Sequence, residues 1–371
     1  MKNIKKFSDM TSYESYIGND PILPNVSYVG DVNEVFYNPL MTYSLKPYTC
    51  IEPLENGTTV NFKSADNNSN GGFKDPINTL YYSKDQINWE PMPLEGIIVN
   101  SNEKLYCKCL DPITNNTENN DMGVGTFVVD KHYNVSGNSM SLIYGDDFED
   151  KTSLEGYNYA LGCLFAEPTN ISNVTGEGML KNVSKDFLPA TTLADNCYMG
   201  MFMGCTSLTT PPQLPATTLK VACYHNMFVR CTSLTTAPEL PATTLASYCY
   251  SVMFWACTSL TTPPSILPAT TLASYCYMGM FNGCTSLTTA PTLPATTLAE
   301  NCYDSMFAGC TLLNYIKMLA IDISGSYSLN AWVYNVSPTG TFIKHPDMTT
   351  LSTGDSGIPE GWEVIDYNVA S

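Results

Sequence analysis

The stretch LPATTLADNCYMGMFMGCTSLTTPPQ, residues 188–213, decides the architecture of this chain because it is repeated. Close copies begin at Leu214, Leu240, Leu267 and Leu293, at intervals of 26, 26, 27 and 26 residues. A repeat of this length is typical of proteins in which each unit stacks on its neighbours and buries a continuous core between them. The sequence therefore predicts a stack of five full units.

Each unit reads as a helix followed by a short strand. In the third unit Thr244 is a suitable N-cap for a helix over residues 245–256. The TSLTT segment that follows, at residues 258–262, favours a strand, which Pro263 and Pro264 end. We therefore expect one helix, one short parallel strand and one proline-fixed loop in every unit.

The cysteines follow the repeat. Cys249, Met253 and Cys257 recur every four residues, which on a helix would form one core-facing stripe. Two residues eight apart on a helix are separated by about 12 Å along its axis, too far for a disulfide. Helices of neighbouring units would be about 8–10 Å apart, again too far for easy bridging. We expect buried, unbridged thiols, because zinc sites need closely spaced ligands that the repeats lack.

The repeat resembles a known family. A Cys, a Met-Phe pair, a second Cys and a Leu-Thr-Thr turn recur over residues 188–313, as in the BspA-like leucine-rich repeat family. The segments KFSDMTSYESYIGND (residues 6–20) and GIPEGWEVID (residues 357–366) look like the ends of bacteriophage-encoded relatives, of the gut Bacteroidales and crAss-like phage kind. The resemblance implies an α/β leucine-rich-repeat solenoid carried on a virion fibre or appendage.

The fold class expected from these observations is multi-domain α+β. An N-terminal anchoring segment, residues 1–45, and a β-sandwich-like domain, residues 46–150, precede the solenoid. Residues 151–187 are expected to be its N-terminal cap, residues 188–313 its five full repeats of 26–27 residues, and residues 314–371 its C-terminal cap.

The anchoring segment carries two short apolar alternations. Val26 and Tyr28 precede a Gly-Asp turn, and Val35, Phe36 and Tyr37 follow it, which predicts a small hairpin. A hairpin alone is marginally stable in water, so we expect it to dock on another virion protein or on a second copy of the chain. A homotrimer would be natural for a fibre.

Comparing the units with one another shows a fixed framework and a few variable positions. Two of these positions, four residues apart, are expected to face solvent and to align into columns across the stack. One reading is a tolerant exposed surface, and the other is a face that binds a ligand or a second subunit. The candidate binding residues are Met199, Met203, His225, Val229, Arg230, Ser251, Trp255, Met278, Asn282 and Asp304.

Metal and cofactor sites are not indicated. Asp146, Asp147, Glu149 and Asp150 form an acidic cluster, but the spacing of a calcium-binding EF-hand is absent, and a solvated acidic turn is the simpler reading. The Cys-Lys-Cys sequence at residues 107–109 is more typical of two strand thiols than of a metal site. We therefore expect no metal and no cofactor.

The amino-acid composition limits the kinds of partner that the protein is expected to bind. The 371 residues carry 17 Lys and Arg against 35 Asp and Glu, and a formal charge of −18 would repel the phosphates of nucleic acid. No apolar run approaches the roughly 18 residues needed to cross a bilayer, and the polar N-terminal stretch lacks the apolar core of an export signal. Membrane insertion and classical export are not expected.

No catalytic residues emerge from the sequence. The chain has three His, no phosphate-binding glycine loop and no HExxH zinc motif, so we expect no enzyme activity. The segment SKDQINW, residues 83–89, resembles the Asp-box hairpin of sialidases, where the box is structural.

The function expected first is a virion structural protein, a head or tail fibre or appendage. It would be assembled in the cytoplasm of the host bacterium and would bind a glycan or protein of the host cell surface. The alternative is a bacterial cell-surface adhesin that binds host matrix or glycans. A glycan hydrolase is a weaker third candidate, supported only by the Asp-box likeness.

Overall fold

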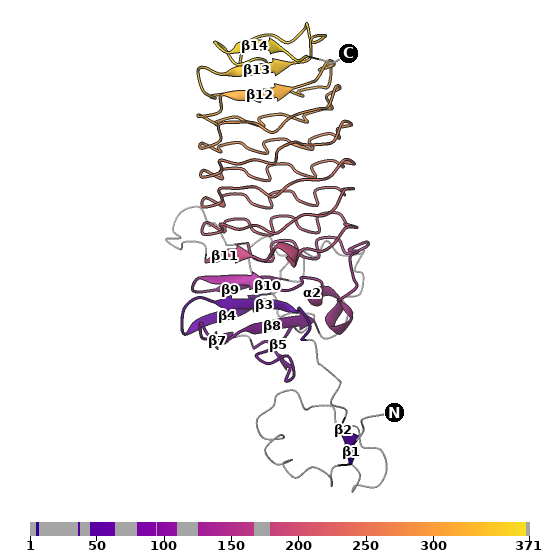
Figure 1. Ribbon diagram of the computed structural model, residues 1–371, viewed down its shortest axis with the longest axis vertical. Helices are drawn as coiled ribbons and strands as arrows, with labels where there is room; N and C mark the ends of the chain where they lie inside the picture. Colours follow the sequence, from indigo (N-terminus) through magenta and orange to yellow (C-terminus); the bar gives the residue numbers. More distant parts are fainter. Residues whose placement is uncertain are drawn as a thin grey trace.

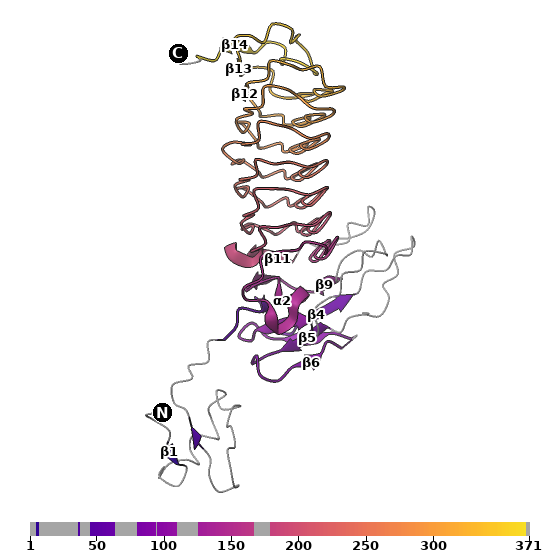
Figure 2. The same ribbon diagram turned by 90° about the vertical axis from the view of Figure 1, so that its right-hand side faces the viewer.

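The computed structural model is an elongated stack of coils with sheets at both ends (Figure 1). A view from the side shows the coils lying parallel to one another along the long axis of the stack (Figure 2). The structure describes residues 5–6, 36–37, 45–63, 80–93, 95–109, 125–166 and 179–368.

The N-terminal end of the stack is built from two sheets. One has six strands in the order β11-β10-β3-β8-β5-β6, antiparallel except for the β10–β11 pair, and the other has the order β7-β4-β9. The strands are β3 (Thr49–Pro53), β4 (Thr58–Lys63), β5 (Leu80–Ser83), β6 (Glu90–Pro91), β7 (Ile97–Val99), β8 (Leu105–Cys109), β9 (Thr126–Val129), β10 (Tyr133–Ser136) and β11 (Leu180–Val183).

One core joins these sheets to the stack. The rings of Phe62 and Phe127 meet edge to face with their centroids 4.9 Å apart, and Phe127 stacks on Phe165 at 5.5 Å. Phe165 in turn stacks on Phe202, the first ring of the repeats, at 5.8 Å. Apolar burial is therefore continuous from the sheets into the repeat units.

The expected helices of the repeats are absent, and the prediction of an α+β leucine-rich-repeat solenoid is wrong. Among the described residues the α-helix is limited to α2 (Ser141–Tyr144), with two 3₁₀ turns, η2 (Gly145–Asp147) and η3 (Lys185–Phe187). Residues 245–256 form a ribbon of consecutive turns. Thr244, expected as a helix cap, instead forms a parallel bridge with Thr218 of the preceding unit.

Backbone hydrogen bonds explain the turn ribbon. In the first unit the N–H groups of residues 197, 199, 201, 203 and 205 donate to the carbonyl three residues earlier. The alternate groups, at residues 196, 198, 200, 202 and 204, donate to carbonyls of the next unit. Half of the ribbon therefore closes turns and half ties the units together, whereas every N–H of a helix interior bonds within the helix.

A left-handed residue recurs every fourth position of the ribbon. The φ angle is positive at Asn196, Gly200 and Gly204 of the first unit, and at the equivalent residues of the other four units. Each such residue reverses the chain and returns the next pair of side chains to the core. The four-residue spacing of Cys249, Met253 and Cys257 is thus the repeat of the ribbon and not the drift of a helical stripe.

The expected parallel strands are reduced to single bridges. Thr236 pairs in parallel with Thr262 of the next unit, and Ile266 with Thr292. Prolines at residues 263 and 264 lack the N–H that a longer ladder would need. Outside the turn ribbon, each coil is therefore joined to its neighbour by only one or two backbone hydrogen bonds at each place. Along the turn ribbon, many backbone hydrogen bonds join the same two coils.

Identical side chains stack in columns inside the coils. The phenylalanines from Phe202 to Phe307 have ring centroids 5.4–5.7 Å apart, nearly parallel. A tyrosine column from Tyr198 to Tyr303 runs beside it at 5.7–6.0 Å. Trp332 packs against the last ring of both columns, so it closes the core toward the C-terminus.

All fourteen cysteines are reduced, and thirteen of them are buried. The unit spacing of about 5.5 Å seen in the ring columns is shorter than the 8–10 Å expected for packed helices. The second cysteine of each unit has a hydrogen-bonding role that the sequence did not reveal. Its thiol donates to a phenylalanine carbonyl of the preceding coil, as from Cys257 to Phe228 at 3.0 Å and from Cys310 to Phe281 at 3.0 Å.

The stack is longer than the five recognised repeats. Residues 157–166, expected as a cap, already form a turn ribbon that donates to the first unit, and residues 326–335 form another after the last unit. The C-terminal end is a parallel sheet of β12 (Tyr315–Met318), β13 (Thr341–Lys344) and β14 (Glu363–Asp366).

The expected anchoring hairpin falls mostly outside the described residues. Phe36 and Tyr37 form β2 (Phe36–Tyr37), which pairs antiparallel with β1 (Lys5–Lys6). Val26, Tyr28 and Val35 lie outside the described residues. The described pairing thus joins β2 to the start of the chain and not to the segment around Tyr28.

The turn ribbon predicts an unusual response to substitution at Val252. This β-branched residue has a φ of 49°, and its counterpart in the preceding unit is Asn226. Left-handed backbone costs most L-residues about 1–2 kcal/mol but is tolerated by Asn. We expect Val252→Asn to raise the free energy of unfolding by about 1 kcal/mol in urea titrations, although it makes the side chain polar. The reverse change Asn226→Val should lower it, and a loss of stability in Val252→Asn would argue against the ribbon.

Candidate functional site

The candidate site is the outer side of the turn ribbon, which we call the ribbon face. Along each ribbon, pairs of inward residues alternate with pairs of outward residues. In all five units the inward residues are the same: a first Cys, Tyr, Met, Phe and a second Cys, at most 1% exposed. The ribbon face consists of the five intervening positions, for example Tyr248, Ser251, Val252, Trp255 and Ala256 in the third unit.

The structure aligns the two variable columns as expected. Backbone hydrogen bonds from Gly200 to His225 and from Val252 to Met278 place the first column side by side across units. The bonds from Gly204 to Val229 and from Ala256 to Asn282 do the same for the second column.

The expectation that every candidate residue faces solvent is wrong at two positions. Ser251 is 0% exposed and Val229 is 5% exposed, because the narrow unit spacing lets larger neighbours cover them. The remaining candidates, which are Met199, Met203, His225, Arg230, Trp255, Met278, Asn282 and Asp304, are half-buried. In the second column Val229 is therefore covered, whereas Met203 and Trp255 on either side of it remain partly exposed.

Three candidate residues from adjacent units contact one another. The guanidinium of Arg230 lies over the indole ring of Trp255, 5.1 Å from its centroid. The indole N–H of Trp255 donates to the side-chain oxygen of Asn282 at 3.2 Å. Cation–π and hydrogen-bond contacts thus fix these side chains against each other on the ribbon face.

A column of tyrosines was missed by the sequence reading. Tyr248 and Tyr275 occupy the first left-handed position of their ribbons and stack with centroids 4.5 Å apart. The same column carries Tyr159 before the repeats and Tyr327 after them, and Tyr327 is 72% exposed. Its sequence signal was one variable position just before the first Cys of each unit, which carries Asn196, Ala222, Tyr248, Tyr275 and Asn301.

Two polar atoms beneath the ribbon face have no hydrogen-bond partner among the described residues. They are the Oγ of Ser251 and the Nδ1 of His225, both buried. Burial lowers the pKa of His225, because desolvation disfavours the charged ring. An unpaired buried polar atom costs about 1–3 kcal/mol. The hydroxyls of the inward tyrosines Tyr198, Tyr224, Tyr250 and Tyr277 are also buried without a partner among the described residues.

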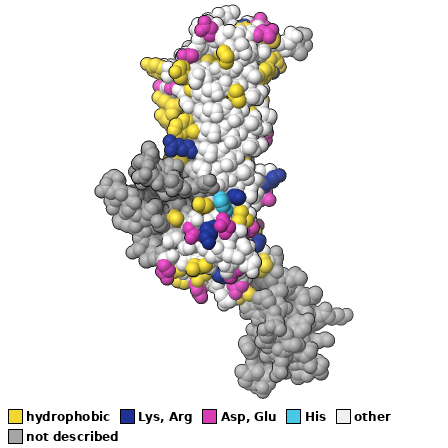
Figure 3. Space-filling view, turned by 90° about the vertical axis from the view of Figure 1, so that its left-hand side faces the viewer, with side chains coloured by type: hydrophobic (Ala, Val, Ile, Leu, Met, Phe, Trp, Pro, Cys, Tyr) yellow, Lys and Arg dark blue, Asp and Glu magenta, His cyan; other side chains and the backbone are white. Residues whose placement is uncertain are grey.

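The face over the repeat units carries few charges. In the space-filling view a broad area over the units is almost without Lys, Arg, Asp or Glu, and hydrophobic side chains gather along one edge of it (Figure 3). Residues 240–292, which are two full units, contain no charged residue at all.

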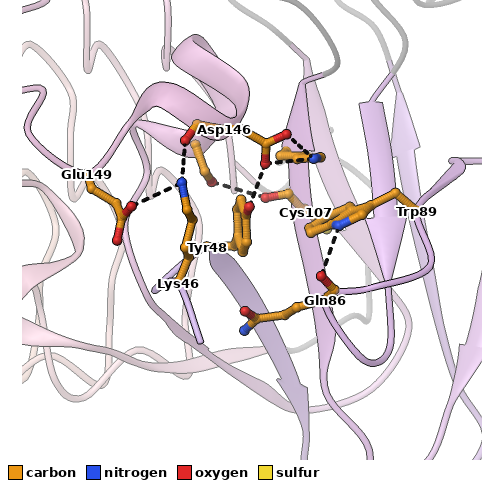
Figure 4. A network of polar contacts seen from close by, with 9 residues as sticks. Lys46, Tyr48, Gln86, Trp89, Cys107, Asp146 and Glu149 are labelled. Atoms are coloured by element: carbon orange, nitrogen blue, oxygen red, sulfur yellow. Dashed lines mark hydrogen bonds and ion pairs between the residues drawn. The ribbon is translucent and has the colours of Figure 1, made fainter. Parts of the chain in front are cut away.

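The acidic cluster at residues 146–150 is partly paired rather than simply solvated. Lys108 donates to both carboxylate oxygens of Asp146 at 2.7 Å, and Tyr48 donates to the same carboxylate (Figure 4). Lys46 forms an ion pair with Glu149 at 3.0 Å. Lys108 also lies 4.3 Å from the ring centroid of Trp89, so the network joins the sheets to the turn after α2.

Metal binding is not supported within the described part of the chain. No group of three or more His, Cys, Asp or Glu side chains there could hold an ion. Cys107 and Cys109 are both buried strand residues of β8, and burial raises the pKa of the Cys107 thiol well above its usual value. None of the described helices has the length and apolar character to cross a membrane.

The network around Asp146 gives a prediction for acid unfolding. Partial burial would raise the pKa of this carboxyl, but the hydrogen bonds from Lys108 and Tyr48 outweigh it and hold the pKa below its usual value. The charged carboxylate therefore stabilises the fold above the unfolded pKa of about 3.9, and this contribution is lost as pH falls through the lower folded value.

We expect Asp146→Asn to lower the free energy of unfolding at pH 7 by about 1–3 kcal/mol, because Lys108 is buried and loses a charged acceptor. Urea midpoints measured between pH 3 and pH 7 should also become less pH-dependent. The matched control is Glu149→Gln, because Glu149 is exposed and its partner Lys46 is only half-buried, and it should cost under about 1 kcal/mol. Equal effects of the two changes would contradict this account.

Comparison with protein-family models, with curated proteins and with solved structures found no match to this chain.

Proposed function

We propose that this protein is a non-enzymatic binding protein whose stacked units present a variable face to a cell surface. The observation that supports this proposal is the contrast between the two sides of one ribbon. Five inward positions carry identical residues in all five units, whereas the five outward positions differ from unit to unit. This pattern is typical of binding proteins in which a constant framework carries variable contact residues.

The stack suits display. Neighbouring coils are tied by several backbone hydrogen bonds and by two aromatic columns, so the face is carried on an extended, continuously packed support (Figure 1). A binding surface held on regular elements keeps its side chains in place and loses little entropy when it binds.

The form we favour is a bacteriophage virion protein, a head or tail fibre or appendage that contacts the host surface. The resemblance of the chain ends to phage-encoded proteins supports it. The partners would then be other virion proteins, further copies of the chain in a homotrimer, and a host-surface glycan or protein. The alternative is a bacterial cell-surface adhesin.

A glycan hydrolase is disfavoured by the Asp-box-like segment itself. Asp85 accepts hydrogen bonds from the backbone N–H groups of Ile87 and Asn88, both at 2.8 Å. Despite partial burial, these bonds lower its pKa to about 2. The carboxylate therefore fixes the turn between β5 and β6 and is poorly suited to act as a catalytic acid.

Sedimentation separates the two forms of the proposal. A culture that produces the protein is fractionated on a density gradient, and the protein is followed by mass spectrometry through particle, cell-envelope and soluble fractions. We expect it to band with intact particles. Recovery in the envelope fraction without a particle band would favour the adhesin, and recovery only in the soluble fraction would contradict both.

A substitution on the ribbon face tests display directly. We expect Trp255→Ala to reduce attachment of the purified chain to cells of the producing culture by about tenfold, because large aromatic side chains dominate binding surfaces. Attachment is measured as the fraction of labelled protein that sediments with the cells.

The matched control is Thr270→Ala, an exposed position of the same stack outside the ribbon. It should leave attachment unchanged. Circular dichroism and urea titration of both variants establish that the stack remains folded. If a folded Trp255→Ala variant attaches to cells as well as the wild type does, the ribbon face is only a surface that tolerates substitution, and the display proposal is contradicted.

A further inference from the structure

One position of the ribbon face carries a residue that its backbone disfavours. The last left-handed position of the ribbon is Gly204, Gly283 and Gly309 in three units and Ala256 in a fourth. In the second unit it is Arg230, with a φ of 59°. A long side chain at a position suited to glycine is strained, so the guanidinium is retained in spite of the backbone.

Arg230 has no acidic partner within the described part of the chain. Its described side-chain contact is the indole of Trp255, and none of the ion pairs in the structure includes it. Between Asp195 and Glu300 the one carboxylate is Glu239, which accepts a hydrogen bond from Ser265. The absence of an acidic partner among the described residues is unusual in a chain with twice as many acids as bases.

The contacts of Arg230 hold the guanidinium in place without using its strongest recognition property. Stacking on Trp255 leaves its N–H donors available for the paired hydrogen bonds that carboxylates accept. Asn282 uses its side-chain oxygen to accept from Trp255, so its amide N–H groups remain as donors beside the indole.

The surroundings indicate what kind of carboxylate fits. The indole of Trp255 supplies planar apolar surface, against which the C–H face of a sugar ring packs well. With one cation on the face, the site matches a ligand with one negative charge. Polyanions such as nucleic acid would be repelled by the net charge of −18.

We propose that Arg230, Trp255 and Asn282 form a binding site for a sugar unit that carries a carboxylate. Arg230 pairs with the carboxylate, Asn282 donates to a ring hydroxyl, and the indole of Trp255 contacts the apolar face of the sugar. This inference rests on the proposed display function and names the class of ligand that the ribbon face takes.

The test measures binding of glucuronosyl-xylobiose, a trisaccharide with a single carboxylate, to the purified full chain by isothermal titration calorimetry. The methyl ester of the same trisaccharide keeps the sugar rings and removes the charge. We expect the acid to bind and the ester to bind about tenfold to a hundredfold more weakly, as for loss of a charged hydrogen bond. Equal binding of acid and ester, or no binding of the acid, would overturn the proposal.

Arg230→Gly isolates the side chain because glycine stands at this position in three other units. We expect this variant to unfold at a higher urea concentration and to bind the acid about tenfold to a hundredfold more weakly. The matched control Ala331→Gly relieves the same kind of backbone strain in the coil after the fifth unit, outside the ribbon face, and it should bind the acid as the wild type does. Unchanged binding in Arg230→Gly would exclude the assigned site.

Failure of the proposed sugar site can be distinguished from failure of the proposed display function. If Arg230→Gly still attaches to cells but no longer binds the trisaccharide, display holds and the cell-surface ligand is another molecule, which overturns the assignment of the ligand class. If the variant loses both, the carboxylated sugar is the ligand through which the protein attaches. An acidic peptide that binds Arg230 while the trisaccharide does not would also overturn the proposal.

Discussion

The alternation of backbone hydrogen bonds along the turn ribbon is the constraint on which the rest of the structure depends. Every second N–H closes a turn within its unit, and the others reach the next unit. This division fixes the spacing of the units, and the spacing fixes the columns of phenylalanine, tyrosine and cysteine inside. It also requires a left-handed residue at every fourth position, which is a cost that each unit meets three times.

The same constraint separates residues that support the stack from residues that are available for other uses. Inward side chains must match those above and below them, because a ring of another size would leave a gap or a clash in a densely packed column. Outward side chains have no such neighbour to match, so Met199, His225 and Asp304 can occupy one column. Packing therefore permits sequence variety on the ribbon face but not in the columns inside the stack.

The sequence allowed the repeat, its bounds and its inward residues to be predicted, because identical copies at a fixed interval indicate stacking whatever the local structure. It did not allow the secondary structure of the unit to be predicted. A four-residue spacing of apolar residues fits a helix nearly as well as a turn ribbon, and Cys249, Met253 and Cys257 do not discriminate between them. Gly200 with Gly204, and Gly279 with Gly283, were the signals that favoured turns, since glycine pairs inside a helix are destabilising.

The candidate site was predicted as columns but not as contacts, because the contacts depend on unit spacing. Packed helices would have kept Arg230 and Trp255 too far apart to stack, whereas coils about 5.5 Å apart bring them together.

Backbone strain identifies unusual residues of the ribbon face that their exposure alone does not identify. Where the backbone favours glycine or asparagine, the presence of Arg230, Tyr248 or Val252 is an energetic cost that stability does not explain. Arg230 lies in the second unit and Tyr248 and Val252 in the third, and these units also hold the His225 and Ser251 atoms that lack a partner among the described residues, so substitutions there test most directly why such residues are kept.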